Sequence, residues 1–406
     1  MEKLLVVSLD TYRRDNIGKA VDGVAISPFL TKVAREGIFY DNYNASCNWT
    51  VPAYASMFTG QPTVAHNFWG VKCFPGQPAN LVFDRLATAG VKPSLLCAGV
   101  LGEADIFKYR TNKYFASTYD TFKVDGMIDL VVQRLAESDF VFFHTFLMHD
   151  YLMHYQYLSP RLGIERQYPF IGVEDSTAMG AKMKAWRNEH FALAPDELAK
   201  LERMYYNECL MVDDFVRFLF GAVLGKFPET RIIVNSDHGE CFSHCGKQAF
   251  DKDWTWLLWP LWHHSSGLCY EQFQVFAIEY GAGVGGPRVD SSLMDHEDIH
   301  RIILDRLGLM APKKPPKTYN IVSTAYDAAG YCGVLEGDEI YLYDLNAGCG
   351  FLLADHIFSN KVIEPRSDKV AKYRDVLLAH RTEVASTEEA DQEVKMRLKG
   401  WGYLST

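Results

Sequence analysis

The feature that most constrains the fold is a regular alternation of short apolar runs with segments of helical periodicity. Residues 4–9 and 139–147 are almost continuously apolar, which is typical of strands buried on both faces of a sheet. Helical patterns separate such runs, as in the segment from Ser27, the expected N-cap, to Gly37. This alternation predicts an α/β fold, a three-layer α/β/α sandwich around a mostly parallel central sheet.

The length indicates one large domain and a smaller appendage. The chain has 406 residues, more than one small domain needs. A segment rich in Pro and Lys, residues 311–317, marks a boundary, and strand-like runs and a final amphipathic helix follow it. We predict a core domain over residues 1–311 and a small α+β subdomain over residues 318–406.

Charge and composition restrict the partners. The chain carries 41 Lys and Arg against 51 Asp and Glu, a net charge of −10, so it lacks the basic face that duplex nucleic acid requires. It has no apolar stretch of about 18 residues, no signal-peptide pattern after Met1, and nine scattered cysteines. We expect a cytoplasmic protein without a membrane partner. A small anionic substrate is compatible with the acidity, because a bound metal can reverse the local field.

Acidic residues and histidines lie at the carboxyl ends of the predicted strands, where ligands gather in parallel sheets. Asp10 ends the first strand, His149 and Asp150 follow a later one, and Asp237 and His238 follow a third. An Asp at such a position can also serve only the local turn. Carboxylates and imidazoles are ligands of divalent metals, and together these positions predict a metal site. The candidate ligands are Asp10, Asp150, Asp237, His149, His154, His238 and His264.

Thr50 is the candidate nucleophile. It lies just before a short predicted helix, and the N-terminus of a helix favours anions. The residues alone favour a plain N-cap role for Thr50 and leave the nucleophile as the alternative. His144 lies inside an apolar run, and we interpret it as a core histidine.

Several segments have the order and spacing of one enzyme family. They are SLDTYRRDNIG at 8–18, WTVPAYASMFTG at 49–60, SDHGE at 236–240, IYLYDL at 340–345 and RLKGWGYL at 397–404. Together they resemble the sulfatase-like branch of the alkaline phosphatase superfamily across essentially the whole chain.

The resemblance implies a metal site formed by Asp10, Thr50, Asp237 and His238, with Thr50 as the nucleophile. In the family, the ion lowers the pKa of the hydroxyl and stabilises the charge that develops during transfer. In-line attack on phosphorus or sulfur leaves a covalent Thr ester, which water then cleaves.

Three positions depart from the sulfatase pattern. Sulfatases carry a Cys or Ser that is oxidised to formylglycine where this chain has Thr50, and oxidation of Thr gives a ketone instead. Tyr54 replaces a family Arg, and Thr11 replaces the second of two adjacent Asp residues. These changes favour a hydrolase acting on phosphate esters, preferably phosphodiesters or phosphonate monoesters. The alternatives are a sulfatase or sulfatase-like transferase, and a catalytically silent binding protein on the same fold.

The family branches that use a Thr nucleophile usually hold two metals. Asp150, His154 and His264 fit the second set, with His263 as a substitute for His264. The sulfatase arm instead has a substrate-binding His here, which makes His149 a substrate contact or general acid and Asp150 a turn residue. We favour two divalent ions; Zn, Mn, Mg and Ca are not distinguished, nor is the oligomeric state.

Overall fold

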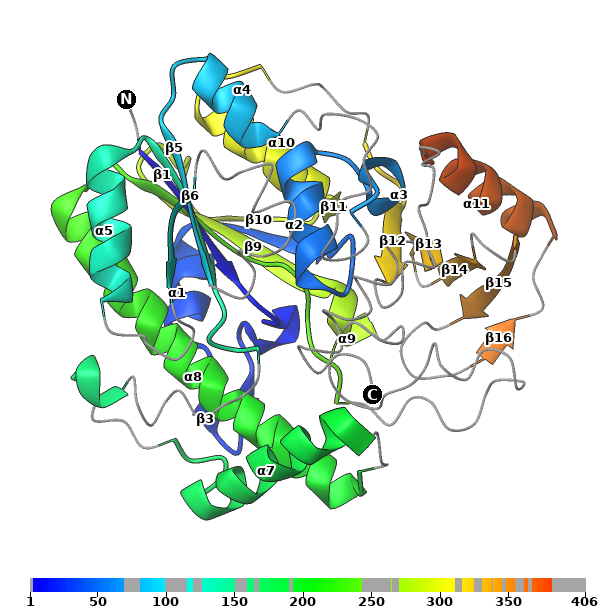
Figure 1. Ribbon diagram of the computed structural model, residues 1–406, viewed down its shortest axis with the longest axis horizontal. Coiled ribbons are helices and arrows are strands. Elements are labelled where there is room, and N and C mark those ends of the chain that lie inside the picture. Colours follow the sequence, from blue (N-terminus) through cyan, green and yellow to red (C-terminus); the bar gives the residue numbers. More distant parts are fainter. Residues whose placement is uncertain are drawn as a thin grey trace.

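The computed structural model of the chain shows a large central sheet between two layers of helices (Figure 1). It describes residues 3–68, 81–98, 115–119, 126–149, 159–163, 168–189, 193–242, 264, 270–310, 316–324, 331–337, 339–344, 348–354, 361–363 and 367–381. The strands of the central sheet are β1 (Leu4–Leu9), β4 (Ile38–Asn44), β5 (Pro93–Ala98), β6 (Phe115–Tyr119), β7 (Phe140–Thr145), β8 (Arg231–Ser236), β9 (Gln274–Gly281), β10 (Arg288–Asp290) and β11 (Met294–Asp295).

The strand order is β10-β4-β9-β8-β1-β7-β5-β6, with β11 also paired to β4. β1 runs parallel to both of its neighbours, β7 and β8, and β5 runs parallel to β6 and β7. Only β9 is antiparallel to its neighbours among the described strands of this sheet. The mostly parallel sheet predicted from the apolar runs is therefore confirmed.

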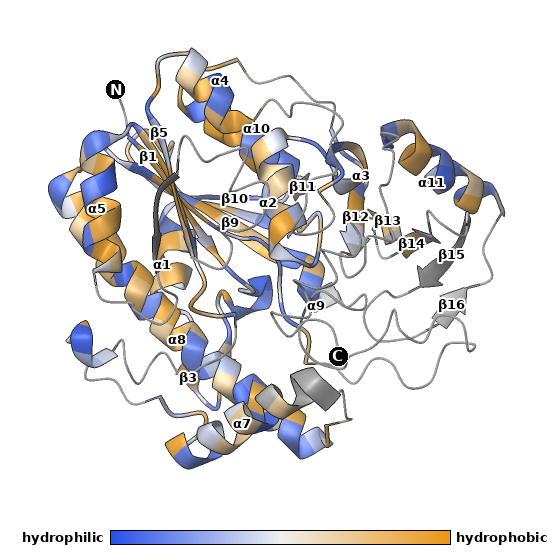
Figure 2. Ribbon diagram, viewed as in Figure 1, coloured by the Kyte–Doolittle hydropathy of each residue, from blue (hydrophilic) through white to orange (hydrophobic). Residues whose placement is uncertain are grey.

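Helices cover both faces of this sheet. α1 (Pro28–Glu36), α5 (Met127–Glu137) and α8 (Pro195–Lys226) lie on one face, and α2 (Thr50–Thr59), α4 (Val82–Thr88) and α10 (His296–Arg306) on the other (Figure 1). Hydrophobic residues dominate the central strands, whereas both kinds of residue alternate along the helices (Figure 2). The shorter or peripheral elements are η1 (Arg14–Asn16), β2 (Ala20–Val21), β3 (Val24–Ala25), α3 (Thr63–His66), α7 (Val173–Glu189) and α9 (Tyr270–Phe273).

The helix α1 begins where the sequence predicts, but its cap differs from the prediction. Ser27 makes no capping hydrogen bond; its hydroxyl instead contacts the hydroxyl of Tyr12 at 2.7 Å and donates to a backbone carbonyl. The carboxylate of Asp213 on α8 accepts hydrogen bonds from the backbone N–H groups of Phe29 and Leu30 at 2.8 and 2.7 Å. A buried carboxylate from a helix distant in sequence thus pairs with the backbone N–H groups that are free of helical partners at the N-terminus of α1.

A second sheet follows the central one in the chain. Its strands are antiparallel neighbours in sequence order, and α11 (Ser367–His380) packs against them. They are β12 (Asn320–Thr324), β13 (Tyr331–Glu336), β14 (Glu339–Asp344), β15 (Cys349–Ala354) and β16 (Lys361–Ile363). This agrees with the α+β composition expected of the C-terminal part. The domain boundary itself stays a prediction, because residues 311–315 lie outside the described ranges.

The second sheet is attached to the segment that leads into α2. The backbone N–H of Ser323 on β12 donates to the carbonyl of Ser46 at 2.9 Å, and His296 on α10 accepts from the N–H of Ser46 at 3.1 Å. Lys317 forms ion pairs with Asp295 and Asp298 at the start of α10. The two contacts of Ser46 thus link the segment before Thr50 to β12 and to α10. Among the described helices, none is both long and apolar enough to cross a bilayer.

Candidate metal centre and nucleophile

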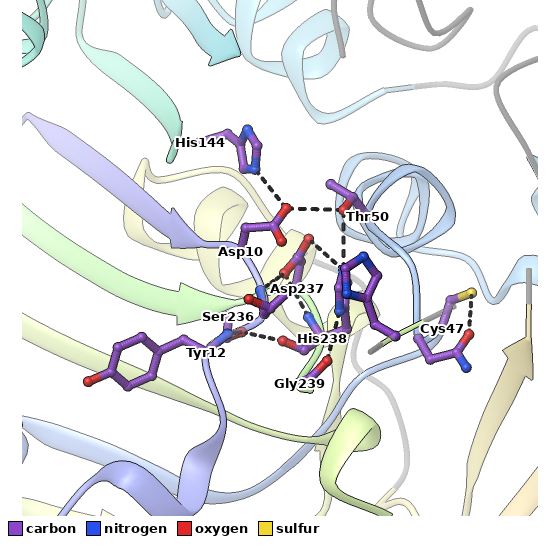
Figure 3. Close-up of polar contacts among 12 residues, drawn as sticks. Asp10, Tyr12, Cys47, Thr50, His144, Ser236, Asp237, His238 and Gly239 are labelled. Carbon is purple, nitrogen blue, oxygen red and sulfur yellow. Dashed lines mark hydrogen bonds and ion pairs between the residues drawn. The ribbon is translucent and has the colours of Figure 1, made fainter. Parts of the chain in front are cut away.

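Three chain segments meet at one edge of the central sheet. Asp10 directly follows β1, and Asp237 and His238 directly follow β8, which pairs in parallel with β1 so that Leu9 lies opposite Ser236. Parallel strands end at the same edge, and this brings the acidic side chains together. Thr50 is the first residue of α2 and reaches the same point from the helical layer (Figure 3).

The hydroxyl of Thr50 contacts two of these residues. Its Oγ1 lies 3.1 Å from Oδ2 of Asp10 and 3.2 Å from Nε2 of His238 (Figure 3). The N-cap position of α2 belongs to Trp49, so the interpretation of Thr50 as a plain N-cap is wrong. Thr50 is only 1% exposed, so its hydroxyl faces the buried polar cluster.

The donor atoms around Thr50 fit a divalent cation. Oδ1 of Asp10 and Oδ2 of Asp237 are buried and have no hydrogen-bond partner among the described residues, which is costly unless a cation lies between them. Oδ1 of Asp237 is already used, because it accepts from the backbone N–H groups of Thr11 and His238 at 3.2 and 2.8 Å. Nδ1 of His238 donates to the carbonyl of Gly239 at 3.0 Å, which leaves the lone pair on Nε2, towards Thr50.

The electrostatics of the two carboxylates support the same conclusion. Burial and the nearby charge of Asp10 raise the pKa of Asp237. Burial also acts to raise the pKa of Asp10, but the hydrogen bond from His144 and the electrostatic interactions with His149 and His238 outweigh it and hold that pKa below its usual range. Two buried carboxylates that repel each other make a strong binding site for a cation.

Thr11 and Tyr54, which depart from the sulfatase pattern, both lie beside this centre. Thr11 adopts a φ of 53°, a strained conformation for a β-branched residue, and its backbone N–H is thereby directed at Asp237. Tyr54 is fully buried and packs edge-on against the ring of His144, with centroids 5.1 Å apart. Neither side chain adds a charge to the site.

His144 belongs to the centre, contrary to its interpretation as an ordinary core histidine. It is fully buried as expected, but its Nε2 lies 3.2 Å from Oδ2 of Asp10. Potential ligand atoms of Asp10, His144 and Asp237 all lie within 4.8 Å of one another. No local spacing in the sequence marks this contact: it follows from the pairing of β7 with β1, which places His144 opposite Ser8, two residues before Asp10.

A second pair of histidines adjoins the first centre. His264 lies with its ring centroid 4.6 Å from that of His238 and 4.8 Å from that of His149, which itself stacks on Phe146 at 3.9 Å. Nδ1 of His264 lies 2.9 Å from Oε2 of Glu240, and both residues are fully buried. The sequence alone predicts no role for Glu240, although this residue belongs to the SDHGE segment.

The remaining predicted ligands lie outside the described residues. They are Asp150, His154 and the substitute His263. The structure therefore brings together Asp10, Thr50, His149, Asp237, His238 and His264, and their roles as ligands or catalytic groups stay predictions.

Comparison with known proteins agrees with this fold. A sequence model described as sulfatase matches residues 2–309. No curated protein sequence matches the chain significantly. A phosphonate monoester hydrolase from Silicibacter pomeroyi is 13% identical, with a TM-score of 0.60, and the alignment covers 98% of this chain and 96% of that one. A putative sulfatase from Bacteroides thetaiotaomicron is also 13% identical, with a TM-score of 0.62 and 96% of each chain covered.

A third solved structure extends the comparison to a synthase. The lipoteichoic acid synthase LtaP from Listeria monocytogenes is 13% identical, with a TM-score of 0.54, and the alignment covers 99% of this chain and 92% of that one. At such low identity these similarities establish the fold and say nothing of the substrate.

Proposed function

Since the chain belongs to the sulfatase family, we propose that it is a metal-dependent hydrolase that cleaves phosphate esters with Thr50 as its nucleophile. Phosphodiesters or phosphonate monoesters are the favoured substrates. The observation that carries this proposal is the position of Thr50 Oγ1, in contact with both Asp10 and His238 and buried at the edge of the sheet. The intact set of contacts around Thr50 gives no support to a catalytically silent binding protein.

Asp10, Asp237, Thr50 and His238 would hold the ion. When bound, a divalent ion lowers the pKa of the nucleophilic hydroxyl and stabilises the charge on the transferring oxygens. Oδ2 of Asp10 accepts a hydrogen bond from Thr50 and fixes the direction of Oγ1. The Gly239 carbonyl fixes the ring of His238 through Nδ1.

In the proposed reaction, the hydroxyl of Thr50 gives its proton to Oδ2 of Asp10, which accepts its hydrogen bond, and Oγ1 attacks phosphorus in line. The bond between Oγ1 and phosphorus forms as the bond from phosphorus to the leaving oxygen breaks. The leaving oxygen takes a proton, and His149 is the candidate donor because it lies beside this centre. Water then attacks phosphorus and gives a proton to His149, the bond from phosphorus to Oγ1 breaks, and Oγ1 takes its proton back from Asp10.

We expect phosphoryl transfer to outrun sulfuryl transfer, because Thr50 cannot form the aldehyde that sulfatases use. The measurement is kcat/KM for matched nitrophenyl phosphate, phosphodiester, phosphonate and sulfate esters. The kcat/KM of the best phosphorus ester should exceed that of the sulfate ester by at least about 100-fold, which corresponds to about 2.7 kcal/mol of transition-state stabilisation. A Thr50→Ala preparation purified in parallel measures contaminating activity. A preference for sulfate would assign the protein to the sulfatase alternative.

We also propose a second ion, held by Asp150, His154 and His264. The contact of His264 with Glu240 supports this, because ligating histidines usually donate their other ring nitrogen to a carboxylate. Two ions there would supply stabilisation of the negative charge that develops on the attacking and leaving oxygens.

Metal analysis of the saturated protein tests the number of ions. We expect two ions per chain, reduced to one by His264→Ala or His154→Ala, with a large loss of kcat. His149→Ala should leave two ions bound, since His149 is not assigned to either ligand set here. One ion in the unmutated protein would establish the one-metal alternative, in which His149 contacts the substrate.

A further inference from the structure

His144 is a buried titratable group in contact with Asp10 that the reaction above does not use. Its Nε2 lies 3.2 Å from Oδ2 of Asp10, the same oxygen that accepts from Thr50 at 3.1 Å (Figure 3). An ionised carboxylate is acceptor-only, so Nε2 of His144 must carry the hydrogen in this contact. Two donors therefore converge on one oxygen of Asp10, and the other oxygen, Oδ1, has no hydrogen-bond partner among the described residues.

The ring of His144 is held in this orientation by the fold. The parallel pairing of β1 with β7 places His144 opposite Ser8, so the side chain lies beside the strand end that carries Asp10. Tyr54 packs edge-on against the ring, with centroids 5.1 Å apart and planes at 76°. Phe146 packs against it at 5.6 Å and 71°. With this packing, His144 can serve as a rigid hydrogen-bond donor.

We propose that His144 is a positioning residue of the metal centre, whose Nε2–H group fixes the carboxylate of Asp10 so that Oδ1 is presented to the ion. The inference rests on the proposed function, since it assumes a cation between Asp10 and Asp237. It assigns different tasks to the two oxygens of Asp10: Oδ2 accepts from His144 and Thr50, and Oδ1 binds the metal. Residues that orient metal ligands in this way contribute to affinity without touching the ion.

The proposal also accounts for the aromatic residue at position 54. Tyr54 occupies a position where the sulfatase pattern has Arg. An Arg there would place a charged group against the ring of His144, whereas Tyr54 places a neutral aromatic ring there. In this chain the neutral ring of His144, packed against Tyr54, donates the hydrogen bond that orients Asp10.

Three substitutions of His144 in the full-length protein separate a donor from a ligand or a packing residue. Gln places an amide N–H group near the position of Nε2, Asn places it near Nδ1, and Leu fills similar volume without a donor. The probe is Co²⁺ alone, titrated into metal-stripped protein, with the dissociation constant and the visible d–d spectrum as readouts. We expect His144→Leu and His144→Asn to weaken binding about 10- to 100-fold, and His144→Gln to stay within about threefold of the unmutated protein. The spectrum of the saturated His144→Gln protein should equal that of the unmutated protein.

His66→Gln is the matched control. His66 is another buried histidine, bonded to Ser56 and to the N–H of Phe68 and not to the centre, so the same change there should lower the melting temperature without changing Co²⁺ affinity.

Each result of this experiment has a defined meaning. An unchanged Co²⁺ affinity in His144→Leu would overturn the proposal. It would also be overturned if His144→Gln bound Co²⁺ as weakly as His144→Leu. In this second case, a cobalt spectrum of His144→Gln that differs from that of the unmutated protein would identify His144 as a direct ligand. If the unmutated protein binds no Co²⁺, the metal centre itself fails and the inference fails with it, a result distinct from failure of the His144 role alone. If His144→Leu does not fold, the comparison of Gln with Asn gives the same decision.

Discussion

Asp237→Asn is expected to abolish nearly all divalent-metal binding and activity while the fold survives. The Asn carbonyl oxygen still accepts from the N–H groups of Thr11 and His238, so the local backbone keeps its partners. The second oxygen of Asp237, which has no hydrogen-bond partner among the described residues, becomes an NH₂ group that a cation repels. We expect metal affinity to fall by about 1000-fold or more, which is about 4 kcal/mol.

The stability of the metal-free variant provides the control. Burial and repulsion from Asp10 raise the pKa of Asp237, so the two ionised carboxylates destabilise the metal-free fold. Asp237→Asn removes that repulsion, and its melting temperature without metal should equal or exceed that of the stripped unmutated protein. Added Mn²⁺ or Zn²⁺ should then raise the melting temperature of the unmutated protein only. Full activity in metal-stripped Asp237→Asn would disprove the assignment of Asp237 as a ligand.

The central sheet was predictable from the sequence because its strands are buried on both faces. Such strands are mostly apolar, so β1 and β7 are visible as nearly continuous apolar runs. The cap of α1 was not predictable in the same way. Ser27 has the residue type of an N-cap, yet Asp213 performs that role from a helix far along the chain. Only the tertiary packing of α8 against α1 decides whether Ser27 or Asp213 caps the helix.

The site was predictable where it depends on strand ends. Asp10 and Asp237 follow neighbouring parallel strands, so sheet geometry alone brings them together. His144 and Glu240 were missed for the opposite reason. Their roles depend on side-chain contacts across strands and loops, with Asp10 and His264 respectively, and no local spacing encodes such contacts. Thr50 lies between these cases, since its residue type fits a helix start and only the packing of α2 directs its hydroxyl into the site.

Thr50→Val is expected to cause the largest loss of catalysis, because it removes the proposed nucleophile and keeps the shape of the side chain. Val retains the branched β-carbon, so the start of α2 and its buried packing are preserved. We expect kcat on the best phosphorus ester to fall by at least about 10⁴-fold, which is about 5.5 kcal/mol. Thr50→Ser keeps a hydroxyl at the same position and should retain most of the activity. The measurement is steady-state kinetics of all three proteins at saturating metal.

The covalent intermediate distinguishes a nucleophile from a residue that only binds metal. Oγ1 of Thr50 contacts both Asp10 and His238, so Val also removes both contacts and is expected to weaken metal binding in part. Acid quenching during turnover, followed by mass spectrometry of the peptide that contains Thr50, should detect one added phosphorus group in the unmutated protein and in Thr50→Ser, with the mass of the substrate less its leaving group. Thr50→Val should show none, even at metal concentrations that saturate its site. If Thr50→Val retains a tenth of the activity, water or another side chain attacks the substrate, and Thr50 acts only as a ligand.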